Sequence, residues 1–585
     1  MFTNKSILIV ALSAIFITNS AQAVIGPIKI TLNTEYRTSN PVIGEIATTI
    51  KLDKSQIINT GATTFTGLLQ SIPSISFEGG QGNLRALRIR GNEASHTLLL
   101  LDGNQVSITG QQPNLDVIPL DQIERIEITK GPFSSLYGPG AIGGVIHVFT
   151  DKDVNSITNS RIDISAGSKG ATKTNFNTYY KNDKSYLDIA MTDFETDGID
   201  ATGDGDLDPI DRKTLGINFG SQLTENTAVN VNFINTKANI QYDDSWSTPK
   251  PDNNLNQVNF GVSHKFGKRS QMNLDLMRQN TQRMGDKYKL NTYTLINETD
   301  FDFSKLSLGL STTNDKDLSN AKNIKHTDLF TQWQGLVIDN EISLGARVID
   351  HDKFSSHLTY NANWARDINS STRVNASYGS ATNLPSHYQN KKNLEHSQTS
   401  LKPERSKSFE FGVQNKSKIG LAEFKVYKSK VVDSFDYHYL NYVDYDGYYF
   451  NNKTVDITGA ELSIKTELLG WNVNTNLDFN RSIDRDTKKQ RGRRPNRSIS
   501  VNLLKSSGKW KRSINWTAKS SAWDGQSETI KLGGYGLLNL STSYNFTEDL
   551  SVYLNRNNAL DKNYEMAKGY NTYGKTTTVG LTYNF

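Results

Sequence analysis

Six aspartates lie within fifteen residues in the first half of the chain. The stretch "DGIDATGDGDLDPID" covers residues 197–211 and contains three glycines but no basic residue. Carboxylates about 5 Å apart repel each other by about 1 kcal/mol in water, and by more in a less polar setting. A cluster of this density needs a compensating partner, and a hard cation is the obvious one. The candidate ligands are Asp197, Asp200, Asp204, Asp206, Asp208 and Asp211.

The stretch does not match an EF-hand loop. Counting from Asp204 puts Pro209 where that loop needs glycine, and Leu215 where it needs a bidentate glutamate. A catalytic carboxylate pair has no support either, because no sugar-binding or nucleophilic residues accompany it. The nine histidines show no metal-ligand spacing, so we do not expect an enzyme. A solvated acidic loop stays open as the alternative.

The chain begins like an exported protein. Lys5 precedes an apolar run over residues 7–17 and a small-x-small cleavage pattern at 21–23, so we expect residues 1–23 to be a cleaved signal peptide. No later stretch approaches the roughly 18 apolar residues of a membrane helix. The absence of cysteine excludes disulfides and thiolate metal sites. The net charge of +5 is small for 585 residues and indicates no particular partner.

Apolar and polar residues alternate through most of the chain. Val229, Val231 and Phe233 alternate with Asn230 and Asn232, and this period of two predicts half-buried strands. The mean hydropathy of −0.54 suits a soluble protein, but a transmembrane barrel also averages as hydrophilic because lipid-facing and lumen-facing side chains alternate. The 25 tyrosines and 24 phenylalanines fit the aromatic girdles of such a barrel. A soluble β-sandwich or β-propeller shows the same alternation and remains an alternative fold.

The length of the alternating region predicts a wide barrel. Its 431 residues, 155–585, give about 22 strands at about 20 residues per strand and connection, and barrels of that width are usually plugged. Residues 41–151 differ in texture, with a short helix candidate, the apolar run "HTLLLLDG" and a glycine-rich segment. We expect them to form a compact α+β domain. The glycine-rich segment lacks the GK[ST] ending of a phosphate-binding loop.

Separated segments of the chain resemble a single family. Residues 89–106, "IRGNEASHTLLLLDGNQV", and 118–152, "IPLDQIERIEITKGPFSSLYGPGAIGGVIHVFTDK", resemble the plug domain of TonB-dependent outer-membrane receptors. Residues 401–412, "LKPERSKSFEFG", and the C-terminal segment 558–585 resemble barrel landmarks of the same family.

This resemblance implies an all-β transmembrane barrel of about 22 antiparallel strands over residues 152–585, with the plug domain of residues 41–151 in its lumen. It also implies a monomer in the outer membrane, beside lipopolysaccharide. Residues 24–40 would hold a linker and the TonB box, a segment that pairs with the energy-transducing protein TonB by strand addition. Pro27 and the lack of an acidic residue depart from the family pattern. The box residues are Ile28, Lys29, Ile30, Thr31 and Leu32.

Charged residues also stand at positions that the family uses. Opposite charges in a polar lumen can hold a plug without making it a permanent core. The resemblance thus implies a plug-to-barrel charge cluster of Arg90, Lys130, Glu404 and Glu410. Lys130 gives a point charge where the family more often has the fork of arginine. A basic run at 488–497 would suggest nucleic acid in another setting, but in an exported barrel we interpret it as an outer-loop patch facing anionic lipid or solvent.

Within the family, the likeness is greatest to receptors for cobalamin (vitamin B12). "IRGNEASH", "DKNYE" and "GYNTYGK" carry it, together with the acidic stretch. It implies that a second loop, "QYDDSWSTPKPD", shares calcium with the first through carboxylate and backbone oxygens. The added calcium ligands are Tyr242, Asp243 and Asp252. The plug residues expected to contact cobalamin are Gly80, Gln81, Asn83, Thr109, Gln111, Gln112 and Asn114.

Two other functions stay open. Receptors for ferric siderophores, haem and other metal chelates share the plug and barrel motifs, so cobalamin rests on the acidic loops and the C-terminal segment. A passive porin-like barrel is the second alternative, and the plug and the TonB box argue against it. We therefore expect a TonB-dependent receptor that imports cobalamin, with calcium as a structural ion and no catalytic cofactor.

Overall fold

A computed structural model of the chain describes residues 34–38, 41–79, 86–150, 158–241, 252–398, 400–441, 446–525 and 527–585. The predicted signal peptide and the TonB box at residues 28–32 lie outside the described residues. So do five of the other predicted site residues: Gly80, Gln81, Asn83, Tyr242 and Asp243.

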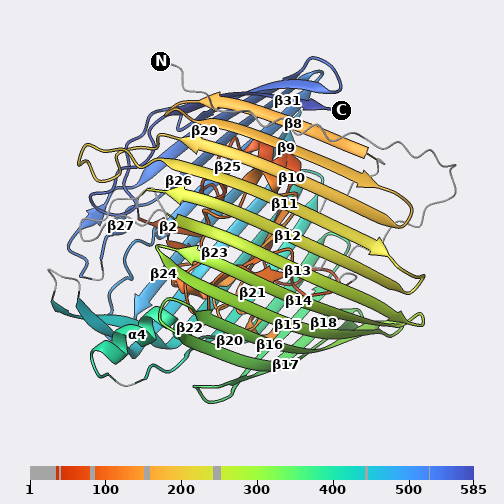
Figure 1. Cartoon of the computed structure of the whole chain (residues 1–585), viewed down its shortest axis with the longest axis vertical. Helices are drawn as coiled ribbons and strands as arrows, with labels where there is room; N and C mark the ends of the chain where they lie inside the picture. The colour runs from red at the N-terminus through yellow and green to blue at the C-terminus, as the bar shows by residue number, and fades with distance from the viewer. Residues whose placement is uncertain are drawn as a thin grey trace.

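The strands after the plug form a closed antiparallel barrel (Figure 1). Among the described residues it has 22 strands, as the sequence predicts, and the last strand pairs with the first, where Gly580 lies opposite Ser165. Because the barrel is closed, no strand has an open edge, and each strand forms backbone hydrogen bonds with two neighbouring strands. The barrel strands are β8 (Thr158–Gly167), β9 (Thr172–Lys181), β10 (Ser185–Thr196), β11 (Ile210–Gln222), β12 (Thr227–Ile240), β13 (Asp252–Phe266), β14 (Ser270–Arg283), β15 (Asp286–Asp300), β16 (Ser304–Asp317), β17 (Lys322–Val337), β18 (Asn340–His351), β19 (His357–Asp367), β20 (Thr372–Asn383), β21 (Glu404–Ser417), β22 (Gly420–Asn441), β23 (Asp446–Leu468), β24 (Trp471–Asp484), β25 (Arg497–Ser507), β26 (Trp510–Lys519), β29 (Tyr535–Asn545), β30 (Leu550–Asn557) and β31 (Thr576–Asn584).

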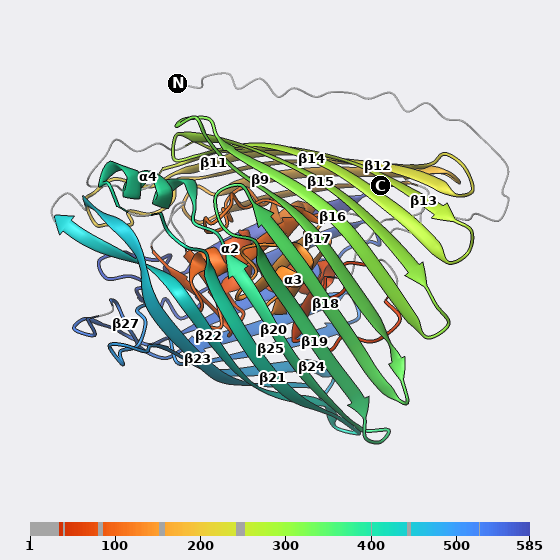
Figure 2. The ribbon, with the colours of Figure 1, turned by 90° about the horizontal axis from the view of Figure 1, so that it is seen from below.

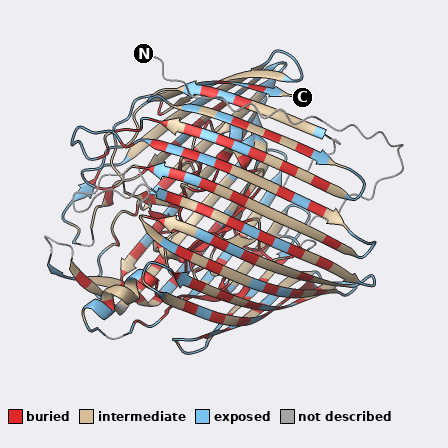
Figure 3. Cartoon of the chain, in the orientation of Figure 1, coloured by how far each residue is buried: buried red, intermediate tan, exposed pale blue. Residues whose placement is uncertain are grey.

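Alternation along the strands separates a lumen face from an outer face. On β10, Thr192 is buried and accepts a hydrogen bond from Gln122 of the plug, whereas the neighbouring Met191 is half exposed. Leu329 and Leu358 lie on the outer face, with 64% and 62% of their surface exposed. Such a row of exposed apolar residues suits contact with lipid. Buried and exposed bands alternate along the wall in Figure 3.

The two ends of the barrel differ in loop length (Figure 2). Short turns such as 418–419 and 469–470 join strands at one end, and the connections 384–403 and 485–496 lie at the other. The helix α4 (His387–Glu395) belongs to the first of these long connections. Outer-membrane barrels have short periplasmic turns and long outer loops, so we refer to the long-loop end as the outer mouth. The two-stranded ribbon of β27 (Ala522–Trp523) and β28 (Lys531–Leu532) lies in another long connection.

The plug domain lies inside the barrel (Figures 1 and 2). Its main sheet has the strand order β1-β6-β7-β4-β5 and its core is apolar, with Leu99, Ile128 and Ile146 fully buried. The run of leucines in β4 is buried on both faces, because strands and helices pack on either side. No helix among the described residues is both long and apolar enough to cross a bilayer. The plug elements are β1 (Thr49–Asp53), α1 (Lys54–Asn59), α2 (Phe65–Gln70), β2 (Ile75–Glu78), β3 (Ala86–Ile89), β4 (Thr97–Leu101), β5 (Asn104–Gln105), β6 (Arg125–Lys130), α3 (Ser134–Tyr137) and β7 (Gly144–Phe149), with short 3-10 turns at Ala94–His96 and Leu120–Gln122.

Candidate functional site

Arg90, directly after β3, connects the plug to the barrel wall. Its guanidinium donates from Nη1 to Glu410 at 2.6 Å and forms two further bonds of 2.9 Å with Glu461 on β23. Lys130 donates to the same Glu461 at 3.0 Å. Burial alone would lower the pKa of Arg90, but Glu461 and Glu410 outweigh it and raise that pKa well above its usual value. The structure thus brings together three of the four predicted charges around a glutamate that the sequence motifs do not mark.

Glu404, the fourth predicted charge, makes a separate plug-to-barrel contact. Its Oε2 lies 2.8 Å from Nε2 of His96 in the plug, and its Oε1 accepts hydrogen bonds from Ser434 and from the backbone N–H of Phe435. Both side chains are buried. His96 belongs to the motif "IRGNEASH", so its position was visible in the sequence, but nothing in the motif indicates its partner.

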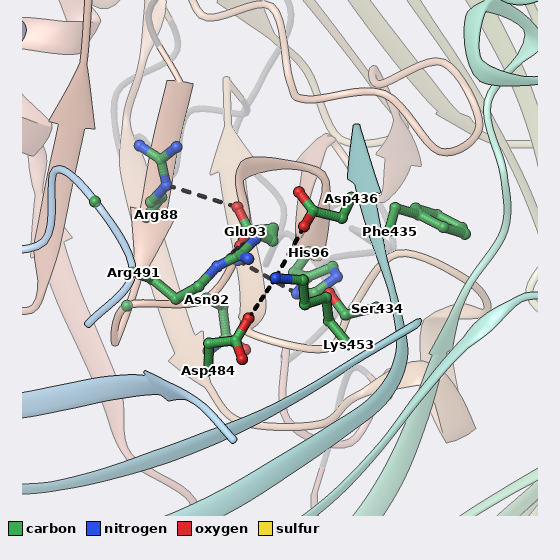
Figure 4. A network of polar contacts seen from close by, with 12 residues as sticks. Arg88, Asn92, Glu93, His96, Ser434, Phe435, Asp436, Lys453, Asp484 and Arg491 are labelled. Atoms are coloured by element: carbon green, nitrogen blue, oxygen red, sulfur yellow. Dashed lines mark hydrogen bonds and ion pairs between the residues drawn. The ribbon is translucent and has the colours of Figure 1, made fainter. Parts of the chain in front are cut away.

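The basic run at 488–497 turns into the lumen instead of facing lipid or solvent. Arg491 and Arg494 are buried and contact Glu93 of the plug at 2.6 and 2.7 Å, and Arg493 donates to Glu78 at 2.5 Å. Burial tends to raise the pKa of Glu93, but the neighbouring arginines hold it well below its usual range. Figure 4 shows Arg491 reaching toward Glu93. Our interpretation of the run as an outward patch is therefore wrong for these three arginines.

The acidic stretch forms the connection between β10 and β11 and folds back on its own backbone. The Asp200 carboxylate accepts hydrogen bonds from the backbone N–H groups of residues 203–205. Asp208 is buried and accepts one from the N–H of Ala201 at 3.1 Å. The loop is therefore held by hydrogen bonds between its carboxylates and its own amides.

Three carboxylates converge at the base of this loop. Asp193, Glu195 and Asp211 offer ligand atoms that all lie within 4.8 Å of one another, but Lys213 already contacts all three at 3.8 to 4.0 Å. Asp252 lies exposed at the start of β13. Within the described part of the chain, the other predicted ligands join no such group: Asp197, Asp200, Asp204, Asp206 and Asp208. Among the described residues, Asp211 is thus the one predicted ligand that joins a carboxylate group, and Lys213 partly compensates the charge of that group.

The second predicted plug apex is bonded to the barrel wall. The backbone N–H of Thr109 donates to Asp315 at 2.8 Å, and Asn114 donates to Asn253 at 3.3 Å. Gln111 lies 3.4 Å from the hydroxyl of Tyr288, and the carbonyl of Gln112 accepts a hydrogen bond from Arg283. Thr109 and Asn114 are buried, whereas Gln111 and Gln112 are partly exposed. Of these four residues, the two glutamines are the ones that a ligand can reach directly.

Aromatic side chains gather at the outer mouth, where α4 packs on the long hairpin of β22 and β23. The ring of Tyr437 lies 4.8 Å from that of Tyr449 and 4.9 Å from that of Tyr439. Tyr388 on α4 approaches Tyr449 at 6.2 Å, and Lys392, one turn further along the helix, lies 3.6 Å from Asp446. We call these residues the aromatic mouth. Sequence reasoning missed it, although tyrosines crowd the segment "SFDYHYLNYVDYDGYYF".

A cavity of about 550 Å³ lies between the plug and the wall strands β20 to β26. Strand β1 lines it on the plug side, Asn476, Asn502 and Asn515 line it on the wall side, and Lys130 and Glu461 stand at its boundary. A smaller cavity of about 80 Å³ lies between the plug and strands β12 to β18. The larger volume is within the range of small-molecule sites.

Comparisons with known proteins agree with this architecture. The model of the TonB-dependent receptor plug domain matches residues 44–145, and the model of the TonB-dependent receptor-like β-barrel matches residues 144–559. The siderophore receptor PirA from Acinetobacter baumannii has a similar structure, with 17% identity, a TM-score of 0.77, and coverage of 92% of this chain and 98% of PirA.

Two further solved structures are similar. One is the ferric enterobactin receptor PfeA from Pseudomonas aeruginosa (16% identity, TM-score 0.78, coverage of 92% of this chain and 98% of PfeA). The other is the copper transporter OprC (15% identity, TM-score 0.77, coverage of 96% and 100%). At these identities the structures establish the fold, while the barrel model alone spans more than half of the chain. The chain therefore belongs to the TonB-dependent receptor family.

Proposed function

We propose that this receptor imports a ferric siderophore or a related metal chelate across the outer membrane, with TonB supplying the work. The observation that carries the proposal is the aromatic mouth, where Tyr388, Tyr437 and Tyr449 lie beside Lys392. Aromatic rings stack on flat ligand groups and tyrosine hydroxyls donate hydrogen bonds, whereas Lys392 already pairs with Glu395 and Asp446 at 3.5 and 3.6 Å. An aromatic chelate can use both the rings and the hydroxyls. The names of the similar structures, which are siderophore and copper proteins, support the same ligand class.

Cobalamin is the second candidate. It rests on the sequence likeness carried by "IRGNEASH", "DKNYE" and "GYNTYGK". None of the three similar structures described above is named as a cobalamin receptor. The comparisons therefore favour the siderophore alternative over our original expectation.

TonB would act on the plug through the segment that precedes it. We propose that a signal peptide at residues 1–23 is removed and that TonB pairs with the box at residues 28–32. The described segment 34–38 begins just after that box and is anchored in the protein, since the hydroxyl of Thr34 donates to Glu127 at 2.5 Å. A pull on the box would thus reach the plug through these anchors.

Calcium on the outer loops stays a proposal. Asp200, Asp204 and Asp208 already accept hydrogen bonds from backbone N–H groups, so calcium would have to replace some of these bonds and would also need the second acidic loop. In that case ligand affinity depends on calcium. Replacing both Asp204 and Asp206 by alanine should then weaken ligand binding and abolish the calcium dependence. Equal affinities with calcium and with chelator in the unmutated protein would refute the proposal.

Titration of the purified receptor tests the ligand class. The probes are a ferric tris-catecholate, haem and cyanocobalamin, each with calcium and with chelator. We expect saturable binding of the tris-catecholate and none of cyanocobalamin. Binding of cyanocobalamin alone would overturn the siderophore proposal in favour of the second candidate. Uptake by cells that continues after the proton gradient is dissipated would instead indicate a passive barrel.

A further inference from the structure

Four arginine side chains meet where the plug touches the outer loop 485–496. Arg88 comes from plug strand β3, and the other three are Arg491, Arg493 and Arg494 of the loop. In Figure 4, Arg491 reaches toward Glu93, and a dashed line joins Arg88 to the same carboxylate. We call these four residues the arginine cluster. Guanidinium groups in such proximity repel one another unless enough anions lie between them.

Glu93 serves three members of the cluster at once. Its carboxylate contacts Arg491 at 2.6 Å and Arg494 at 2.7 Å, while Nε of Arg88 lies 4.0 Å away, outside hydrogen-bond distance. One negative charge is therefore shared among three positive ones.

Glu78 forms ion pairs with two members of the cluster. It contacts Arg88 and, at 2.5 Å, Arg493, which also contacts Asp524 at 2.8 Å. Across the described residues, the four guanidinium groups thus share the three carboxylates that contact them. These direct contacts alone leave one guanidinium charge uncompensated.

Lys453 and the two aspartates beside it carry one net negative charge, which compensates the cluster on the Arg491 side. Lys453 bridges Asp436 and Asp484 at 3.1 and 2.8 Å, and these two carboxylates act on the Arg491 side of the cluster, where they help to raise the pKa of Arg491. Arg88 has no such help. Burial, and then the repulsion of Arg494, lower its pKa to about 9. The under-compensated charge therefore lies at the plug end of the cluster.

Arg88 also keeps unused hydrogen-bond donors. Its Nε and Nη1 are buried without an acceptor, as is Nη1 of Arg491, and only 7% and 5% of these two residues is exposed. Buried polar groups in folded proteins are nearly always paired, and leaving a charged one unpaired is costly. The two unpaired donors of Arg88, at the less compensated end of the cluster, indicate a place for an anion.

An anion can reach the cluster by replacing a glutamate. About a quarter of the side-chain surface of Glu78, Glu93 and Arg493 is exposed, whereas Arg88 and Arg491 lie beneath. Glu78 stands at the end of β2, so its carboxylate can leave Arg88 and remain hydrated. A ligand oxygen would then take its place against Arg88 and Arg493.

We propose that the arginine cluster binds an anionic group of the transported ligand, which displaces Glu78 and pairs with Arg88 and Arg493. This inference rests on the proposed import of a metal chelate and narrows it to anionic chelates, such as ferric tris-catecholates. A neutral ligand forms no ion pair with Arg88 or Arg493, so the cluster distinguishes the two classes electrostatically.

Binding of two ferric chelates to three variants tests the proposal. The probes are a ferric tris-catecholate, which is trianionic, and a ferric tris-hydroxamate, which is neutral. Arg88→Gln should weaken binding of the anionic chelate by about tenfold or more, the effect of one charge-assisted hydrogen bond, and leave the neutral chelate unchanged. Glu78→Gln should tighten binding of the anionic chelate, because it removes the competing carboxylate.

Arg405→Gln is the matched control, since Arg405 also pairs with a carboxylate, Asp433, but on the exposed surface of the barrel. Its affinities should equal those of the unmutated protein. Damage to the fold would weaken binding in both the Arg88 and the Glu78 variants, whereas an anion site predicts opposite signs. Unchanged or equally weakened binding of both chelates by Arg88→Gln would overturn the proposal.

The same experiment separates this inference from the proposed function. If the unmutated receptor binds neither ferric chelate, the import proposal itself fails. A receptor that binds the neutral chelate more tightly than the anionic one upholds chelate import and refutes the anion site. Inorganic phosphate gives an independent measurement, since it should raise the melting temperature of the unmutated protein more than that of Arg88→Gln.

Discussion

Arg90 and Glu461 face each other across the plug-to-barrel interface with two parallel hydrogen bonds of 2.9 Å, from Nε to Oε1 and from Nη2 to Oε2. This bidentate pairing is the geometry that arginine and carboxylate form best. The ring of Tyr427 lies 4.0 Å from the guanidinium carbon and closes one face of the pair. The plug is thus held by an ion pair whose arginine is buried and whose glutamate keeps 12% of its side chain exposed.

Replacing Arg90 by glutamine should weaken the attachment of the plug to the barrel. The change leaves Glu410 and Glu461 buried with one fewer positive charge, and breaking a buried pair in this way costs about 3–5 kcal/mol. We expect a loss of that size in the free energy of unfolding, measured by denaturant titration. The double variant Arg90→Gln with Glu461→Gln should recover part of it, because no unpaired carboxylate is left at that position. An unaltered free energy of unfolding in Arg90→Gln would show that this ion pair does not stabilise the protein.

The anchor that follows the proposed TonB box should weaken as pH rises. The Glu35 carboxyl accepts hydrogen bonds of 3.0 Å from the N–H groups of Ile46 and Ala47, and burial raises its pKa from 4.5 to about 8. The folded state therefore holds a proton that the unfolded state has lost between these two values. Over this window the stability of the anchor falls by up to roughly 1.4 kcal/mol per pH unit.

Hydrogen exchange at residues 46 and 47, corrected for its intrinsic pH dependence, measures this effect. Exchange should be faster at pH 8 than at pH 5 in the unmutated protein. Glu35→Gln carries no titrating group at this position and should show little pH dependence. Equal pH dependence in the two proteins would assign the effect to another group.

The fold could be predicted from the sequence because period-two alternation and a closed barrel are linked directly. Each strand must present one face to lipid and the other to the lumen, so the pattern gives the strands and the length gives about their number. Of the plug-to-barrel cluster, Arg90, Lys130 and Glu410 stand in recognisable motifs. Glu461 stands in no such motif. It could not be predicted, because its position opposite Arg90 depends on the register between β22 and β23 and on how the plug lies in the barrel.

The direction in which the basic loop turns could not be predicted for a similar reason. Arginines in a polar loop look alike whether they face solvent or the lumen, and only their contact with Glu78 and Glu93, some 400 residues earlier, decides. The role of the acidic stretch is open for a different reason. Short-range hydrogen bonds between aspartate side chains and nearby amides compete with metal binding, and the order of aspartates and glycines does not show which of the two prevails.

Replacing Asp200 by alanine should loosen the acidic loop even without calcium. Its carboxylate holds the amides of Gly203, Asp204 and Gly205, and each lost hydrogen bond to a charged group is worth about 1.5–3 kcal/mol at most. We expect hydrogen exchange at these amides to become about tenfold faster or more in the presence of chelator. Asp204→Ala is the control, since it leaves the Asp200 bonds in place. If Asp200→Ala exchanges at the unmutated rate, the loop is held by something other than these bonds.

The cavity of about 550 Å³ predicts the side of the plug on which a ligand passes. It is several times larger than the cavity of about 80 Å³ beside strands β12 to β18, so less of the plug must move to open a path along β1. The chain contains no cysteine, and a single cysteine can therefore be labelled without background. Asn502→Cys, modified with a bulky maleimide, should stop import while leaving surface binding intact, because the label fills the larger cavity. Arg405→Cys with the same label, on the exposed surface of the barrel, is the control and should still import. Import by labelled Asn502→Cys at the rate of the unlabelled protein would place the path elsewhere.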